Sequence, residues 1–235
     1  PHARGKDGWA GADKEPAAGK VRPPETGDVI PVEKRLGIAI GLVSGAIIAF
    51  QLCLMQILSI VQWHHYAAMI ISLALLGFGA SGTCIALMRE RLLRGYARMI
   101  PTFLLACGIT MALAVGTSQN SFVRFDSLLL FAEPCSLWRL VLTCLVYFVP
   151  FFFGALAIGL MFTRYAYDID RLYCANLIGS ALGGILAVLL MGKFPPERIP
   201  ALLAILPILA GIIMCRKLRW VSAATLVRLP LAWLL

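Results

Sequence analysis

Charge is scarce in this sequence. Asp, Glu, Lys and Arg supply only 14% of its 235 residues, whereas soluble domains average about 25%. Hydrophobic residues make up 60% of the chain and gather in long runs. Because so few charges cannot cover the surface of a soluble domain, the composition excludes a soluble globular protein. It predicts a polytopic membrane protein whose main partner is the lipid bilayer.

Patterns typical of metal, redox and catalytic sites are missing as well. The chain has three histidines and seven cysteines, and no two cysteines form a C-x-x-C pair. Six of the cysteines lie in apolar runs, where Cys behaves as a small hydrophobic residue. The net charge of +9 is expected of a membrane protein, because cytoplasmic loops retain Lys and Arg. We therefore predict no metal site, no cofactor, no catalytic residues and no nucleic-acid partner.

Long apolar runs are what the sequence does have. They cover residues 36–61, 65–88, 99–117, 137–163, 172–192 and 199–215. Each is close to the roughly 20 residues that cross a bilayer core as a helix. Lipid offers the backbone no other hydrogen-bond partner, so these runs must be helical. The predicted fold is an all-α, polytopic transmembrane helix bundle with six spans.

The bundle is expected to occupy residues 36–217, between two segments of different character. Residues 1–35 are polar and rich in Pro and Gly, which predicts a flexible tail. Residues 218–235 contain a short apolar run interrupted by Arg228 and Pro230. They form a candidate start of a seventh span, and the sequence leaves that question open.

The distribution of Lys and Arg sets the orientation. Seven of these residues lie in the N-terminal tail, none lies between the first two spans, and four lie between the second and third. Over the whole bundle, sixteen fall on the side of the N-terminus and four on the other. Since cytoplasmic loops retain Lys and Arg, we expect the N-terminus to be cytoplasmic.

Gly77-Phe78-Gly79-Ala80-Ser81-Gly82 has the G-x-G-x-x-G spacing of a dinucleotide-binding loop. Such a loop needs a preceding strand and an acidic residue about 20 positions later, but here one hydrophobic run continues through the motif. We interpret the glycines as helix-packing residues that let neighbouring backbones approach closely. The same role is predicted where glycines recur every four residues, so the full packing set is Gly37, Gly41, Gly45, Gly77, Gly79, Gly82, Gly179 and Gly183. At position 183 the sequence predicts that Leu is damaging and Ala mild.

Polar residues inside the spans are few. Gln51 and Gln56 lie in the first span and Asn176 in the fifth. Interhelical hydrogen bonding is the favoured role for these amides, and substrate binding is the alternative. The short sequence Trp63-His64-His65-Tyr66 joins the first two spans. Amphipathic rings favour the membrane interface, so anchoring is the favoured role there, with ligation of a metal or a pigment as the alternative.

Two segments resemble a known family. AFQLCLMQILSIVQWHHYAAMIISLALLGFGASG (49–82) is similar to the opening helices of spermidine synthase-like (polyamine aminopropyltransferase-like) proteins that carry an N-terminal membrane domain. PFFFGALAIGLMFTRYAYDIDRLYCANLIGSALGG (150–184) is similar to a second block of that family. The resemblance implies a bundle of membrane helices, and in the family a soluble catalytic domain follows them.

Departures from the family pattern bear on function. This chain has Gln51 where the family commonly has an acidic residue, Gln56 where it has Arg, and Asn176 where it has Asp. The resemblance therefore implies the fold of the family but not its catalytic activity. We expect a non-catalytic accessory or scaffold subunit that binds other membrane subunits, in a bacterial inner (cytoplasmic) membrane. The alternatives are the membrane anchor of a longer aminopropyltransferase-like enzyme and a small-molecule transporter.

The orientation predicted from the charge asymmetry can be tested by labelling. Single cysteines introduced by His65→Cys and Gly95→Cys into a cysteine-free variant should react from opposite sides of the membrane. Position 95 should be labelled from the cytoplasm, because it lies in the basic loop after the second span. Labelling of position 95 from the outside only would contradict the predicted orientation.

Overall fold

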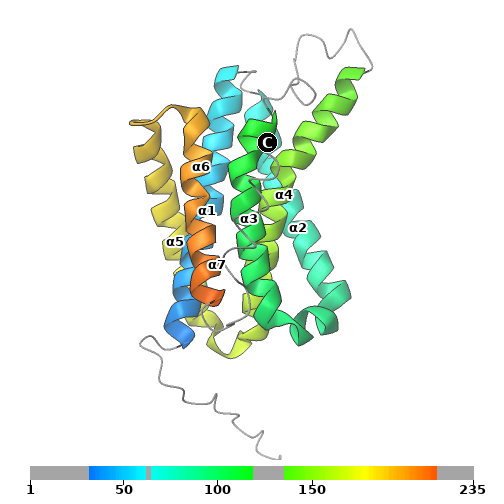
Figure 1. Ribbon diagram of the computed structural model, residues 1–235, viewed down its shortest axis with the longest axis vertical. Coiled ribbons are helices and arrows are strands. Elements are labelled where there is room, and N and C mark those ends of the chain that lie inside the picture. Colours follow the sequence, from blue (N-terminus) through cyan, green and yellow to red (C-terminus); the bar gives the residue numbers. More distant parts are fainter. Residues whose placement is uncertain (1–31, 62–64, 119–134, 216–235) are drawn as a thin grey trace, which may run out of the picture.

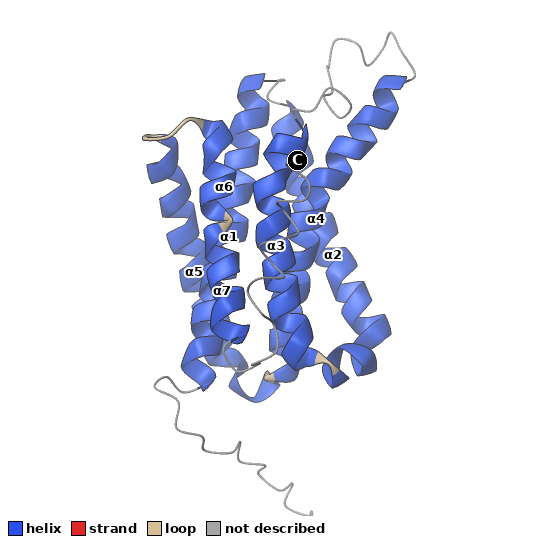
Figure 2. Ribbon diagram, in the orientation of Figure 1, coloured by secondary structure: helices blue, strands red, loops and turns tan. Residues whose placement is uncertain are grey.

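The computed structural model describes residues 32–61, 65–118 and 135–215. Within these ranges the chain consists of helices and short turns, and no strand is present (Figure 2). The helices are α1 (Val32–Val61), α2 (His65–Arg94), α3 (Tyr96–Ser118), α4 (Cys135–Arg164), α5 (Ile169–Met191), α6 (Ile199–Leu203) and α7 (Ile205–Cys215), with single turns η2 (Ala166–Asp168) and η3 (Pro196–Arg198). The prediction of an all-α fold is confirmed.

Six helical segments of the described chain are long and apolar enough to cross a membrane. Five of them correspond to α1 to α5, and the sixth, Pro196–Cys215, combines η3, α6 and α7. Each coincides with one of the predicted apolar runs. The chain is therefore a polytopic integral-membrane helix bundle, as the sequence predicted.

The helix boundaries correct two expectations. α1 begins at Val32, so the last four residues of the predicted tail are helical. α2 continues beyond the predicted end at residue 88 to Arg94, with a kink at Met88, where φ is −110° and ψ is 20°. The rest of the tail, residues 62–64, the loop 119–134 and the candidate seventh span lie outside the described residues.

The sixth span is interrupted near its middle. α6 ends at Leu203 and α7 begins at Ile205, with Ala204 in a turn between them. Pro207 follows two residues after the start of α7 and has no backbone N–H. The carbonyl of Leu203 therefore lacks its usual donor four residues later. A proline inside a helical pattern explains the break.

α1 lies at the centre of the bundle. It packs against α2, α4, α5, α6 and α7, while α3 packs against α4 and α7. α5 and α2 lie on opposite sides of the bundle (Figure 1). The burial of the spans follows this arrangement. In the most apolar 18-residue stretch of each span, 61% is buried for α1, 28% for α2 and 17% for α5.

Aromatic and branched side chains fill the centre between α1, α3 and α4. The rings of Phe50 and Phe151 are both fully buried, with centroids 5.6 Å apart. The Cys107 thiol of α3 donates a hydrogen bond to the carbonyl of Pro150 in α4 at 3.4 Å. This core fixes α1, α3 and α4 together, whereas α5 depends on a single crossing.

Candidate functional site

The crossing of α1 and α5 brings the two predicted glycine repeats together. Gly45 faces α5 so closely that an added Cβ would lie 2.7 Å from the carbonyl oxygen of Gly179. A Cβ on Gly179 would lie 2.5 Å from Cα of Gly41, and a Cβ on Gly183 would collide with the backbone of Gly45. Because backbone touches backbone at these positions, no side chain fits between the helices.

The same face of α1 continues toward the start of the helix. A Cβ at Gly41 would lie 3.4 Å from the carbonyl oxygen of Ala175, and one at Gly37 would lie 3.8 Å from Cβ of Ala175. The contact is therefore tightest where Gly41 and Gly45 meet Gly179 and Gly183, and looser around Gly37. Small residues every four positions on both helices make this arrangement possible.

A partly buried hydrogen bond lies beside the glycines. The Ser44 hydroxyl donates to Oδ1 of Asn176 at 2.5 Å, linking α1 to α5. Ser44 is only 3% exposed. Asn176 thus makes an interhelical hydrogen bond, the role that the sequence analysis favoured for it.

The other two amides do not join this group. Gln51 is half-buried and Gln56 is exposed, and neither forms a hydrogen bond with a described residue. Gln51 lies seven residues beyond Ser44, which is roughly 10 Å along the helix at about 1.5 Å per residue. The three amides therefore do not converge on one polar site, and within the described part of the chain neither glutamine makes the expected interhelical hydrogen bond.

The G-x-G-x-x-G motif lies in the middle of α2, so it forms no nucleotide-binding loop. Gly77 packs against α4, where an added Cβ would lie 2.8 Å from Cβ of Phe151. A Cβ at Gly79 or Gly82 would meet nothing within 4 Å. The packing prediction is therefore wrong for these two residues inside the described chain, since they lie on the outer face of α2.

Four further glycines lie at helix crossings but belong to no glycine repeat in the sequence. An added Cβ at Gly108 would lie 2.9 Å from the Ala204 carbonyl oxygen, and one at Gly154 would lie 2.6 Å from Cδ1 of Ile47. At Gly159 it would lie 2.6 Å from Cδ1 of Ile85, and at Gly211 2.9 Å from Cγ of Leu105. None of them repeats at a spacing of four residues. Only the position of the opposite helix reveals their role.

An aromatic cluster joins α3 to the end of α4. The Arg164 guanidinium lies 4.8 Å from the ring centroid of Tyr96 and 5.6 Å from that of Tyr165. Burial raises the pKa of the Tyr165 phenol above its ordinary value of 10.0, and Tyr96 raises it further, while Arg164 opposes the shift. A cation over two neighbouring rings is a stabilising contact, and it fixes the ends of these helices.

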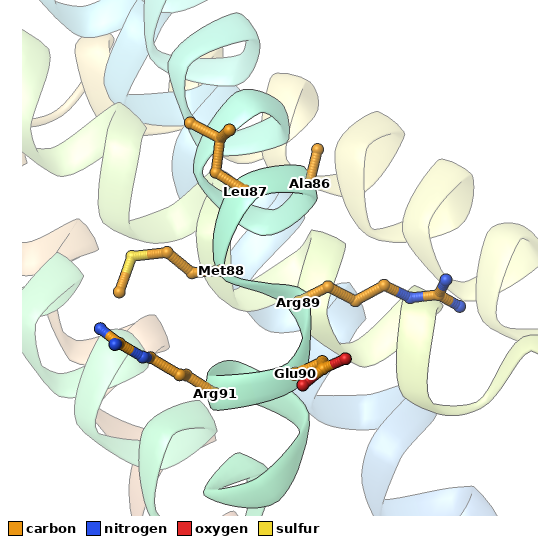
Figure 3. Close-up of a pocket in the computed structure, with 6 residues that line it drawn as sticks. All are labelled: Ala86, Leu87, Met88, Arg89, Glu90 and Arg91. Carbon is orange, nitrogen blue, oxygen red and sulfur yellow. The ribbon is translucent and has the colours of Figure 1, made fainter.

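The kink in α2 creates a shallow hollow of about 500 Å³ lined by residues 86–91. Figure 3 shows that Arg89 and Arg91 point in opposite directions. Glu90 forms an exposed ion pair with Arg94 at 3.4 Å. Because the two arginines diverge, they cannot hold one anion between them, and the hollow is not a candidate binding site.

The predicted interface residues lie at the edge of the described chain. Trp63 and His64 fall outside it, and His65 and Tyr66 begin α2. Within the described ranges, no group of three or more His, Cys, Asp or Glu side chains could hold a metal ion. Anchoring and ligation both stay predictions for this segment.

Comparison with known proteins adds no relative. No family model, no curated protein and no solved structure matches the chain. The fold and the packing of its helices define the class as an integral-membrane helix bundle. The resemblance to spermidine synthase-like membrane domains stays a prediction.

The backbone contact predicts a sharp difference between adjacent glycines of α5. Gly183→Ala should lower the melting temperature in detergent, because even a methyl group collides with Gly45; overpacking typically costs about 1–3 kcal/mol. The geometry thus corrects the sequence-based expectation that Ala is mild at position 183. Gly184→Ala is the matched control, since its Cβ would meet nothing within 4 Å. Equal melting temperatures for the two variants would contradict the close crossing.

The Ser44–Asn176 hydrogen bond predicts a modest coupling between the two side chains. We expect a double-mutant cycle of Ser44→Ala and Asn176→Ala to give about 0.6 kcal/mol, as hydrogen bonds between membrane helices typically do. The measurement is reversible unfolding in mixed micelles. Additive effects of the two substitutions would show that the pair does not stabilise the crossing.

Proposed function

We propose that this chain is a non-catalytic integral-membrane subunit that helps to hold a larger membrane assembly together. It would reside in a bacterial inner membrane with its N-terminus in the cytoplasm, and it would derive from a spermidine synthase-like membrane domain. The charge asymmetry and the resemblance of segments 49–82 and 150–184 support this proposal.

The observation that carries the proposal is the pairing of the buried polar side chains. In the described residues these are Ser44, Ser81 and Thr143. Ser44 donates to Asn176, Ser81 to the carbonyl of Phe78 at 2.8 Å, and Thr143 to the carbonyl of Arg139 at 2.9 Å. An enzyme or transporter site needs polar groups that converge on a ligand. Here the buried groups bind the protein itself, which favours a structural role.

The outer face of α2 is a surface suited to a neighbouring subunit. Gly79 and Gly82 have no packing partner within the described chain. Around them Leu75, Leu76 and Phe78 are 68%, 59% and 43% exposed. Small residues flanked by large apolar ones allow another membrane helix to approach closely.

Site-specific photo-cross-linking tests the proposal. A photoreactive amino acid at position 79 should give one discrete cross-linked product with another membrane protein in native membranes. The matched control is position 184, which is also a glycine with nothing within 4 Å but lies on α5. We expect no discrete product there. Two results together would refute the subunit proposal. Position 79 would give no cross-linked product, and native mass spectrometry would show that the chain extracted from native membranes is a monomer.

A further inference from the structure

An apolar groove runs along α1 between α5 and α7. Its volume is about 660 Å³, within the range of roughly 300–1,000 Å³ typical of ligand pockets. Ile38 and Leu42 of α1, Ile178 and Leu182 of α5, and Leu206 of α7 line it, together with the glycines of the crossing. The glycines leave this surface hollow because they contribute no side chains.

The groove covers only one half of a membrane. Along α1 it extends from Lys34 to Gly45, which is roughly 17 Å at about 1.5 Å per residue. A bilayer core is about 30 Å thick, so the groove ends near the middle of the membrane. A transmembrane helix would extend well past that end, whereas one acyl chain belongs to one leaflet.

The groove carries a charge at one end. Lys34 lines it at the start of α1 and forms no ion pair with a described residue. The remaining lining is Gly, Ala, Leu and Ile. An amphiphile with a long apolar chain and an anionic head group therefore matches the groove in both length and charge.

The chain's own segment 220–235 is a poorer occupant. Arg228 would lie about 12 Å into the segment as a helix, at about 1.5 Å per residue, next to apolar lining. A charged side chain in that position is costly within a membrane. Pro230 would also interrupt such a helix. Neither feature suits a groove in which Lys34, the one cation among its described lining residues, already lies at the end.

We propose that this groove binds an anionic phospholipid of the leaflet on the side where α1 begins, with one acyl chain in the groove and the phosphate paired with Lys34. This inference does not depend on the proposed subunit role. The groove is formed within a single chain, so a lipid would bind whether or not a protein partner is present.

Native mass spectrometry of the full chain in mild detergent tests the proposal. Phosphatidylglycerol and phosphatidylcholine with identical acyl chains are added in turn. The wild type should retain one phosphatidylglycerol in preference to phosphatidylcholine by about fivefold, because a lysine near anionic lipid contributes about 1 kcal/mol. Lys34→Gln should lose this preference and keep weak binding of both lipids. A preference unchanged by Lys34→Gln would overturn the assignment of the phosphate.

Filling the groove tests the position of the acyl chain. Ile38→Trp should weaken binding of both lipids, because Ile38 lines the groove and is 46% exposed. Leu145→Trp is the control, since Leu145 is 53% exposed on α4 and does not line the groove. If Ile38→Trp does not fold, Ile178→Trp replaces it, because Ile178 lines the groove from α5. Equal lipid binding by the groove and control variants would refute the proposal. A stable dimer of the wild type that dissociates in either groove variant would also refute it, because a second copy of the chain would then occupy the groove.

Discussion

The contact between the backbones of α1 and α5 is the constraint on which the outer part of this bundle depends. In a membrane there is no hydrophobic driving force between helices, which associate through packing, hydrogen bonds and lipid entropy. α5 packs on α1 and makes no other extensive helix contact among the described residues. Gly41 and Gly45 meet Gly179 and Gly183 so closely that a methyl group added to Gly45, Gly179 or Gly183 collides with backbone. The position of α5 therefore depends on the absence of side chains at Gly45, Gly179 and Gly183.

The same device recurs at other crossings, with glycines on one side and bulky residues on the other. Gly154 accommodates Ile47 between α4 and α1, and Gly77 receives Phe151 between α2 and α4. Around the centre, Phe50 and Phe151 fill the space that the close approach of the helices leaves. The bundle is thus held by shape complementarity, and its few buried hydroxyls bond to neighbouring protein atoms. Such an interior supports the structural role proposed above.

Glycine placement also shapes the surface. On the α1–α5 side the glycines draw the helices together and leave a groove bounded by α7. On α2, Gly79 and Gly82 face outward and meet nothing within the described chain. Glycine therefore allows close packing inside the bundle and also shapes two different external surfaces. The first surface matches a lipid in length and charge, and the second suits a neighbouring helix.

The sequence alone determined the six long apolar spans, their helical form and the glycine repeats of α1 and α5. Lipid leaves the backbone only one way to satisfy its hydrogen bonds in such runs, so hydropathy sufficed for the fold class. A glycine every four residues is also a local pattern, which is why Gly41, Gly45, Gly179 and Gly183 could be recognised. Which other glycines touch a neighbour was decided only by the tertiary structure. Gly79 lies in a glycine motif and Gly154 does not, yet Gly79 faces outward and Gly154 receives Ile47. A packing role depends on what lies opposite and not on the residue itself.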